Sequence, residues 1–409
     1  MVKCMSCGMK NIGASAIRSA LKKVYRFTRG SIFLILVKVW AYFYSVRFLI
    51  LDDIRIGHML MMAGYYFKCK EAGRHDPKVL DILVTSSAPV NETFADKIGE
   101  QAKLLRSSII KSLCADAALV WPKNQNVVVM KCVLYDRGVY PHMEPLYHFS
   151  KQEMKKGEAL IEEMGIPKDG KIICFFARDQ AYLNRVDKTR NWDYHSFRNG
   201  SLEDYQKMAE HFADQGYWLL RVGAYVDKEI NVDHPRIIDY SSKFRSDFGD
   251  AFLGVRSSWF IGDLSGITDI YKSMGNGGVI CNMGLGDLYL TWRNFISVPM
   301  LYQDLSDGKL LSYKESISRN LHLVYRADLL KDRGVQVVYP GSEIMIDVLQ
   351  EKIQRDKGAW IEASGDLELE QAFWSLYPKD FMGYGTRDPR EMSPLSILFL
   401  RRYSHLVLN

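Results

Sequence analysis

A small polar turn follows an apolar strand pattern in the second half of the chain. The segment WFIGD (259–263) ends in Asp263, and Ser265 and Gly266 then lead into a helical pattern. Unpaired N–H groups and the positive dipole end at the start of a helix favour a phosphate. Gly266 permits close backbone approach, and Ser265 can bind a phosphate or simply cap the helix. Both interpretations stay open, and Asp263 suits a sugar hydroxyl better than an anion.

Arginines follow other predicted strands at the same edge. Arg178 and Asp179 come after the strand 171–177, Arg221 lies in WLLRVG, and Arg245 lies in KFRSDF. Guanidinium groups bind phosphate oxygens in bidentate fashion. Because open α/β sheets bind ligands at the carboxyl ends of their strands, we expect these side chains to converge on a diphosphate.

The remaining reactive side chains could serve the nucleotide and the proton transfer. Tyr240, at the end of RIIDY, is expected beside a nucleotide. Asp52, Asp53 and His58 lie in the loop after the first predicted strand and are candidates for a general base. A loop histidine is also commonly structural or solvated, and this alternative stays open.

The sequence gives no sign of a metal or a redox cofactor. Cys4 and Cys7 form one Cys-x-x-Cys pair, but no second pair at zinc spacing follows. No Asp-x-Asp follows a predicted strand, so the cations and the helix N-terminus are expected to replace a metal. Gly284 and Gly286 resemble the start of a dinucleotide fingerprint, but Tyr289 stands where its third glycine belongs. We therefore expect no cofactor.

The elements that position these residues alternate along the chain. Alternating strand and helix patterns predict an α/β fold with parallel sheets. Predicted strands lie at 47–51, 79–87, 117–122, 126–135, 171–177, 217–223, 236–241, 258–262 and 277–281, and predicted helices from about 59, within 88–105, and at 151–164, 201–216, 246–256, 265–275 and 393–408.

The N-terminus differs in charge from the rest of the chain. The first fifty residues carry nine Lys or Arg and no Asp or Glu, whereas the remainder carries 45 basic and 48 acidic residues. This distribution gives no reason to expect a nucleic-acid partner. Residues 17–29 are basic and amphipathic, and 31–46 are almost wholly apolar.

The apolar stretch 31–46 is shorter than the roughly 20 residues of a spanning helix, and no export cleavage site follows it. We expect a helix lying on an anionic membrane surface, with the protein peripheral on the cytoplasmic side of the inner membrane. The alternative is a buried first helix of the globular domain.

Several segments together resemble a family of bacterial glycosyltransferases associated with surface polysaccharide synthesis. They are RIGH (55–58), CFFARDQAYLN (174–184), LLRVG (219–223) and the long run 237–270. The resemblance implies two Rossmann-like domains in a GT-B-like arrangement, with the nucleotide-sugar bound mainly by the second and the acceptor by the first. The corresponding division is a membrane-associating segment 1–46, an acceptor domain 47–165, a donor domain 166–390 and a C-terminal helix 391–409.

The resulting functional hypothesis is a metal-independent glycosyltransferase. It would transfer a sugar from a nucleotide-diphosphate donor to a lipid-linked or surface glycan acceptor. Two alternatives stay open: a nucleotide-sugar 2-epimerase of the same fold, and a non-catalytic nucleotide-binding protein docked on the membrane. Sugar, nucleotide base, acceptor and linkage are not encoded in any pattern that we identify.

Overall fold

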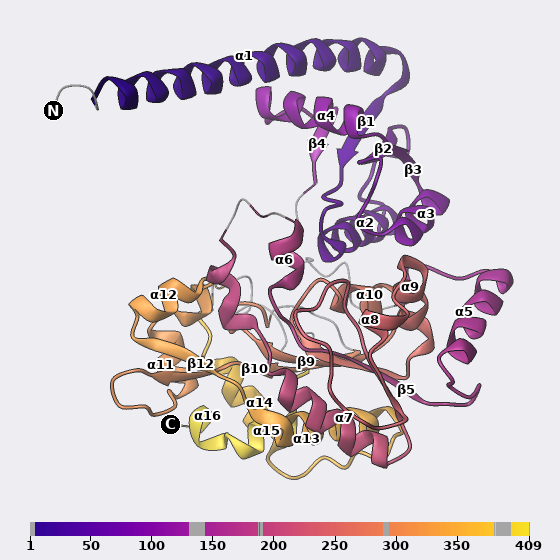
Figure 1. The fold of residues 1–409 in the computed structure, drawn as a ribbon, viewed down its shortest axis with the longest axis vertical. Coiled ribbons are helices and arrows are strands. Elements are labelled where there is room, and N and C mark those ends of the chain that lie inside the picture. The colour runs from indigo at the N-terminus through magenta and orange to yellow at the C-terminus, as the bar shows by residue number, and fades with distance from the viewer. Residues whose placement is uncertain are drawn as a thin grey trace. The chain divides into compact units, whose positions relative to one another are not determined.

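The computed structural model describes residues 5–130, 144–186, 188, 191–288, 294–379, 381 and 394–408, with side chains from residue 16 onward. The chain divides into two compact units, Met1–Cys132 and Val133–Asn409 (Figure 1). The Cys4 and Cys7 side chains and Tyr289 lie outside the described residues, as does the part of the predicted strand 126–135 after Met130.

The first unit is built on a parallel sheet. In its described residues four strands lie in the order β3-β2-β1-β4, and every pairing is parallel. The elements are α1 (Met5–Tyr44), β1 (Val46–Ile50), α2 (Ile56–Glu71), β2 (Leu80–Thr85), α3 (Glu92–Gln101), β3 (Lys103–Arg106), α4 (Ser108–Val120) and β4 (Val127–Val129).

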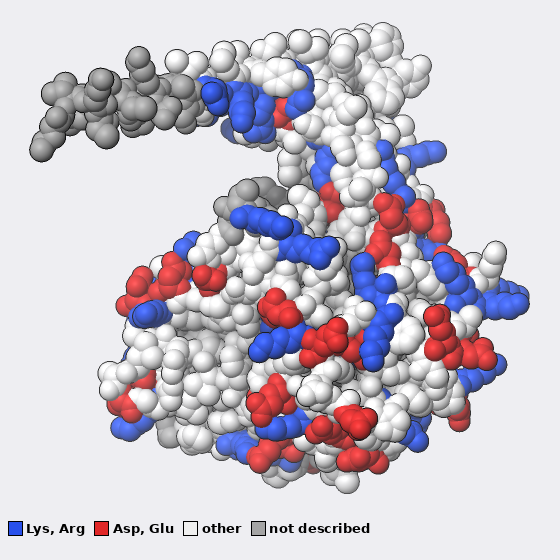
Figure 2. Space-filling view, in the orientation of Figure 1, with Lys and Arg blue, Asp and Glu red and all other residues white. Residues whose placement is uncertain are grey.

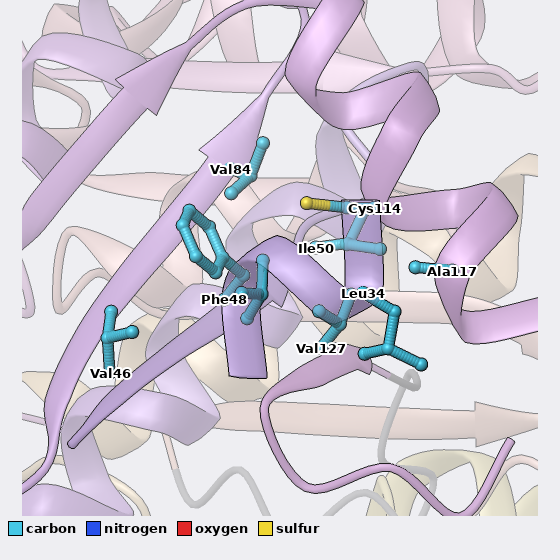
Figure 3. Close-up of a cluster of buried hydrophobic side chains, with 9 residues drawn as sticks. Leu34, Val46, Phe48, Ile50, Val84, Cys114, Ala117 and Val127 are labelled. Atoms are coloured by element: carbon cyan, nitrogen blue, oxygen red, sulfur yellow. The ribbon is translucent and has the colours of Figure 1, made fainter. Parts of the chain in front are cut away.

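The long helix α1 packs along α4 and onto the sheet (Figures 1 and 3). Leu34 and Val37 are buried with Phe48 of β1 and Ala117 of α4 in one apolar cluster. The two helices approach closely at Gly30, where a Cβ would lie 2.6 Å from the Asp116 carbonyl carbon and oxygen. Only a glycine fits at this crossing without moving α4.

An ion-pair cluster joins the same two helices. Asp116 of α4 is buried, and its carboxylate accepts from Nε of Arg26 at 2.7 Å and from Nε of Arg29 at 2.9 Å. Hydrogen bonds from the two arginines hold the pKa of Asp116 below its usual value against the opposing effect of burial. The part of α1 from Arg26 to Val37 is therefore fixed both by packing and by charge.

The second unit contains a larger parallel sheet. Among its described residues six strands lie in the order β10-β9-β8-β5-β6-β7. The strands are β5 (Ile172–Phe176), β6 (Trp218–Arg221), β7 (Ile237–Ile238), β8 (Trp259–Asp263), β9 (Gly278–Met283) and β10 (Phe295–Pro299). Taken in chain order this is the 3-2-1-4-5-6 arrangement of a Rossmann sheet. A separate antiparallel pair joins β11 (Leu301–Asp304) to β12 (Val335–Val338).

Helices and short 3₁₀ turns connect and cover these strands (Figure 1). They are α5 (Lys151–Glu163), α6 (Ala181–Val186), η1 (Asp193–Arg198), α7 (Leu202–Asp214), α8 (Tyr240–Lys243), α9 (Asp247–Arg256), α10 (Thr268–Ser273), α11 (Tyr313–Ser318), η2 (Leu321–Leu323), α12 (Ala327–Asp332), α13 (Gly341–Asp356), α14 (Asp366–Ser375), α15 (Ile397–Arg402) and α16 (Ser404–Leu408). The α/β class with parallel sheets is thus confirmed. The helix α5, predicted from 151–164, packs on α9 in the second unit.

Three predicted elements are wrong. Residues 117–122 are not a strand, because 108–120 form the helix α4, capped by Ser107 with Cys114 and Ala117 facing the core. Residues 103–105 are not helical but belong to β3, which pairs with β2. The single helix expected at 393–408 is two short helices, and Leu395 before them makes a β-bridge with Ser297.

The exposed part of α1 keeps the amphipathic character seen in the sequence. Side chains such as Ile32, Ile35, Phe43 and Tyr44 are exposed although apolar. Among the described residues, no helix is long and apolar enough to cross a membrane. The alternative of a buried first helix of the globular domain is met in part, since Leu34 and Val37 of α1 lie in the core while other side chains of the helix are exposed.

Candidate functional site

The candidate donor site lies where the second sheet reverses its strand order. Chain order runs outward from β5 to β6 and β7 on one side, and from β8 to β9 and β10 on the other. The carboxyl ends of β5 and β8 therefore flank the switch point at which Rossmann sheets bind ligands. Arg178 and Asp179 follow β5, and Ser265 and Gly266 follow β8.

Asp263, the last residue of β8, ties the strand ends together. It is fully buried. Its Oδ2 accepts from the Arg178 N–H at 2.9 Å, and its Oδ1 accepts from the side-chain amide of Asn282 at the end of β9. A Cβ on Gly200 would overlap the same carboxylate, so the chain there must be glycine. The expectation that Asp263 binds a sugar hydroxyl is not supported, because its oxygens accept from the protein.

Burial also changes the protonation of this carboxyl. Desolvation raises the pKa of Asp263 to about 7, although the Arg178 N–H and the Asn282 amide oppose that rise. A carboxyl that can hold a proton near neutral pH is suited to a structural hydrogen-bonding role at the base of a site for an anion.

The Arg178 side chain is positioned by the segment that follows β5. Its Nη1 donates to the Asn199 amide oxygen at 2.7 Å and to the His195 carbonyl at 3.1 Å. Burial, and next the charge of Arg198, lower the pKa of Arg178 to about 10. Arg198 itself pairs with Asp287 at 2.9 Å, and its buried Nε has no hydrogen-bond partner among the described residues. Two cations close enough for the charge of one to lower the pKa of the other, with an unused donor on Arg198, favour binding of an anion.

The Ser265–Gly266 turn is not a capped helix start. The helix α10 begins only at Thr268, and its N-cap, Ile267, makes no side-chain cap. The backbone carbonyls of Ser265 and Gly266 instead accept hydrogen bonds from the N–H groups three residues further along the chain. Thr268 N–H donates to the Ser265 carbonyl and Asp269 N–H to the Gly266 carbonyl, each at 3.2 Å. Gly266 does not have the positive φ that would require glycine. Capping therefore does not explain Ser265.

The turn instead presents donors that the protein does not use. The N–H groups of residues 265–267 donate no hydrogen bond within the described part of the chain. The hydroxyls of Ser265 and Thr268 are likewise buried without a partner among those residues. Buried polar groups are normally paired, so a cluster of unpaired donors indicates a site for a ligand. Consecutive backbone N–H groups at a turn form an anion-binding concavity.

Asp179 and Arg221 hold the neighbouring loop. Asp179 accepts from the Ala181 and Asp227 N–H groups, both at 3.0 Å, and burial raises its pKa. Arg221 is buried at the end of β6 and donates to the Lys228 carbonyl and to Asp239. Both residues lie at the edge expected from the sequence, but their contacts anchor the segment 222–230.

Arg245 and Tyr240 lie in a cluster of their own at the start of α9. The Arg245 guanidinium bonds Asp250 at 3.0 Å and Asp247 at 2.8 Å. The Tyr240 hydroxyl donates to Asp250 at 3.1 Å and is bonded to Ser246. No recorded hydrogen bond or ion pair among the described residues joins this cluster to Arg178 or Ser265.

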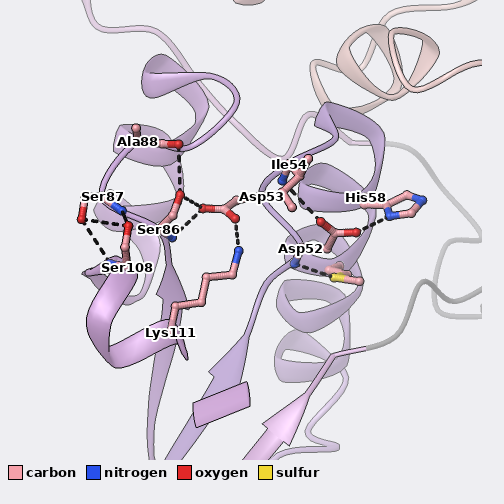
Figure 4. Close-up of polar contacts among 10 residues, drawn as sticks. Asp52, Asp53, Ile54, His58, Ser86, Ser87, Ala88, Ser108 and Lys111 are labelled. Carbon is pink, nitrogen blue, oxygen red and sulfur yellow. Dashed lines mark hydrogen bonds and ion pairs between the residues drawn. The ribbon is translucent and has the colours of Figure 1, made fainter. Parts of the chain in front are cut away.

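The first unit carries a carboxylate–imidazole pair after β1 (Figure 4). His58, in the first turn of α2, lies with Nδ1 2.6 Å from Oδ2 of Asp52. The hydrogen bond from His58 lowers the pKa of Asp52, so the carboxylate is the acceptor and Nδ1 the donor. Both side chains are 36% exposed. In that tautomer Nε2 is the basic nitrogen, as a general base requires.

Asp53 has a different environment from its neighbour Asp52. It is buried, and its Oδ2 accepts from the N–H and hydroxyl of Ser86, both at 2.6 Å. Its other oxygen pairs with the Lys111 ammonium (Figure 4). These contacts join β1, β2 and α4, which is a structural role.

Sequence reasoning missed four residues of the switch point. Thr268 lies one helical turn after Ser265, and Asn282 is the last residue but one of β9, the strand next to β8. The sequence patterns that indicated Ser265 and Arg178 therefore apply to both. Arg198 and Tyr339 carry no comparable signal. Tyr339 bonds the Phe197 carbonyl at 3.0 Å and lies close enough to influence Arg178.

No potential metal site of three or more His, Cys, Asp or Glu residues occurs among the described residues.

Solved structures of several sugar transferases align with this chain at low similarity. A family 9 glycosyl transferase from Veillonella parvula aligns at 12% identity over 70% of this chain and 95% of its own, with a TM-score of 0.39. The ADP-heptose lipopolysaccharide heptosyltransferase II of E. coli aligns at 14% over 57% and 84%, with a TM-score of 0.35. E. coli heptosyltransferase WaaC with ADP aligns at 13% over 68% and 99%, with a TM-score of 0.31.

No protein-family model matches the chain. No curated protein matches it either. Structural similarity at these TM-scores is too low to decide function, so we infer function from this chain's own residues.

Proposed function

We propose that this protein is a glycosyltransferase that uses a nucleotide-diphosphate sugar as donor. One observation carries the proposal: at a Rossmann switch point, unused N–H groups at 265–267 and two unpaired buried hydroxyls follow β8, while Arg178 follows the neighbouring strand β5. A diphosphate has the negative charge and the acceptor oxygens that these unpaired donors and cations would bind.

In this proposal the second unit stabilises the leaving group. Negative charge grows on the diphosphate as the bond to the sugar breaks, and preorganised donors lower the energy of that state. The turn at 265–267, the Ser265 and Thr268 hydroxyls and Arg178 would supply that stabilisation, with Arg198 adding positive charge. Asp179 and Arg221 would act by fixing the adjoining loop. No metal is needed for this role.

The proposed base is His58 in the first unit. The Asp52 carboxylate orients the ring and stabilises the imidazolium that forms when Nε2 takes the proton of an acceptor hydroxyl. The acceptor is proposed to be a lipid-linked or surface glycan, and α1 is proposed to dock the protein on the anionic inner face of the cytoplasmic membrane.

A 2-epimerase would need acid and base carboxylates at the donor site itself. The carboxylates that the sheet places at the switch point, Asp179 and Asp263, instead accept hydrogen bonds from protein groups. A non-catalytic docking protein would give the His58–Asp52 pair no task. No observation favours either over a transferase.

The test is a panel of ADP, UDP and GDP with thermal-shift detection, followed by calorimetric titration of the nucleotide that stabilises the protein. Arg178→Ala should weaken binding about ten-fold or more, because a hydrogen bond to a charged group contributes about 1.5–3 kcal/mol. Arg245→Ala is the matched control, since its guanidinium is already engaged by Asp250 and Asp247.

Equal affinity of Arg178→Ala and Arg245→Ala would remove Arg178 from the donor site. Lack of stabilisation by every diphosphate would end the proposal. With a nucleotide-sugar, a transferase releases nucleotide only when an acceptor is present, whereas an epimerase converts the sugar without one.

A further inference from the structure

An open apolar cavity lies between α1 and the sheet of the first unit. Its volume is about 510 Å³ and its lining is almost wholly apolar. Leu36 and Trp40 come from α1, Leu80 and Ile82 from β2, and Lys103 stands at the start of β3. The volume lies in the range of small-molecule sites, about 300–1,000 Å³.

The cavity results from the way α1 is seated. Leu34 and Val37 pack α1 against β1 and α4. The side chains of α1 that face β2 and β3 do not fill the space between the helix and these strands. Leu36 is 62% exposed, Trp40 40% and Leu80 43%. Exposed apolar surface of this kind costs about 25 cal/mol for each Å² left in water, so covering it is favourable.

We propose that this cavity receives an acyl chain of an anionic membrane phospholipid. Other apolar side chains in the same stretch of α1, including Ile32, Ile35 and Val39, are exposed. These would enter the acyl boundary of a bilayer and place a lipid chain beside Leu36.

Charge favours this occupant. Lys103 lines the cavity, and Arg18, Lys22 and Lys23 lie on the exposed N-terminal part of α1. Figure 2 shows basic side chains gathered at the N-terminal end of the described part of α1 and an uncharged surface along the rest of it. Cations at this position complement phosphate head groups, at about 1 kcal/mol for each Lys or Arg near the surface.

A second copy of the chain is a poorer occupant. The first fifty residues contain no acidic side chain. Two α1 helices packed side by side in parallel would bring their basic N-terminal parts together with no acidic residue on either helix, which is unfavourable. The inference rests on the membrane docking in the proposed function and is independent of the donor site.

The experiment uses the full chain and a lipid in monomeric form, so that adsorption to a surface does not contribute. Lauroyl lysophosphatidylglycerol, below its critical micelle concentration, is titrated calorimetrically into the protein. Leu36→Asp is compared with Ile35→Asp, because the two positions are neighbours and are 62% and 61% exposed, but only Leu36 lines the cavity.

We expect saturable one-to-one binding, weakened at least ten-fold by Leu36→Asp and unchanged by Ile35→Asp. Lys103→Ala should weaken binding of this anionic lysolipid but should not weaken binding of the zwitterionic lauroyl lysophosphatidylcholine. Unchanged melting temperatures of the variants exclude misfolding.

Equal effects of the two aspartates would overturn the proposal, as would lack of saturable binding. Co-sedimentation with phosphatidylglycerol vesicles separates the remaining outcomes. Vesicle binding without binding of the monomeric lipid would mean that α1 binds the membrane surface and that the cavity is not a lipid-binding site. A lipid-free dimer that Leu36→Asp dissociates would assign the cavity to a second copy. Nucleotide binding measured on the same samples reports separately on the donor site.

Discussion

At the scale of single residues, the switch point depends on one buried carboxyl. Asp263 joins the ends of β5, β8 and β9 through Arg178 and Asn282. The sequence placed a polar residue at this strand end, but hydrogen-bond partners 85 and 19 residues away along the chain are not visible in local patterns. Its role as an acceptor within the protein could only come from the structure.

The raised pKa of Asp263 makes stability depend on pH in a defined direction. Unfolded, the carboxyl titrates near 3.9, and folded at about 7. Between these values the folded state holds the extra proton, so this group's contribution falls as pH rises and becomes constant above the folded pKa. Relative to Asp263→Asn, which does not titrate, the native protein should lose up to about 4 kcal/mol between pH 4 and 7.

Urea denaturation of the two proteins at a series of pH values measures this difference. The asparagine loses one acceptor, so it is expected to be less stable at pH 4, with the gap closing as pH rises. If the difference in the free energy of unfolding between the two proteins stays constant with pH, Asp263 is ionised over the whole range and burial does not raise its pKa.

The arginines show how far residue patterns can reach. Arg178 was found because it follows a strand, and the structure places it at the switch point. Arg245 occupies an equally suggestive sequence position, but Asp247 and Asp250 lie two and five residues further on and engage it. Arg198 lies in a 3₁₀ turn with no pattern of its own, so only the tertiary structure brings it next to Arg178.

At the scale of elements, α1 is the least ordinary part of the chain. Its basic and apolar halves were predicted separately, yet they form one continuous helix. The segment 117–122 was misjudged because a short apolar run fits a strand or a buried helix equally well. The N-cap at Ser107, thirteen residues before the end of α4 at Val120, was the signal that separates the two.

The packing of α1 against α4 should be destabilised when Gly30, at the point where the two helices approach closely, is replaced by a larger residue. In Gly30→Ala the new methyl group would press on the Asp116 carbonyl, and overpacking of this kind costs about 1–3 kcal/mol. Gly99→Ala in α3 is the matched control, because its Cβ would lie 3.8 Å from Leu104 and meets ordinary contact. Alanine there should be neutral or slightly stabilising.

Labelling of Cys114 provides the readout. This thiol is buried in the cluster with α1, and burial raises its pKa to about 12, so it reacts when the helices separate. Mass spectrometry of the labelled peptide should show reaction on the order of ten times faster in Gly30→Ala, since 1–2 kcal/mol changes an equilibrium about 5–30-fold. Equal labelling rates of Cys114 in Gly30→Ala and Gly99→Ala would mean that α4 shifts to accommodate the methyl group without loss of packing.

At the scale of the whole molecule, the alternation of strands and helices was enough to predict an α/β fold with parallel sheets. The strand orders were not predictable from it, because neighbours in a sheet are chosen by crossover geometry and not by chain order. The charge asymmetry was readable from the sequence alone. The cavity was not, since its walls come from residues 33–48, 80–82 and 103–110, which meet only in the fold.

The account depends most on the claim that the turn after β8 binds the diphosphate of the donor. Hydrogen–deuterium exchange with and without the nucleotide that stabilises the protein tests it directly. The N–H groups of residues 265–267 have no acceptor among the described residues, so they should exchange fast in the free protein and at least ten-fold slower with nucleotide bound. Residues 246–250, around the Arg245 cluster, should not change. Bound nucleotide that leaves exchange at 265–267 unaltered would contradict the account.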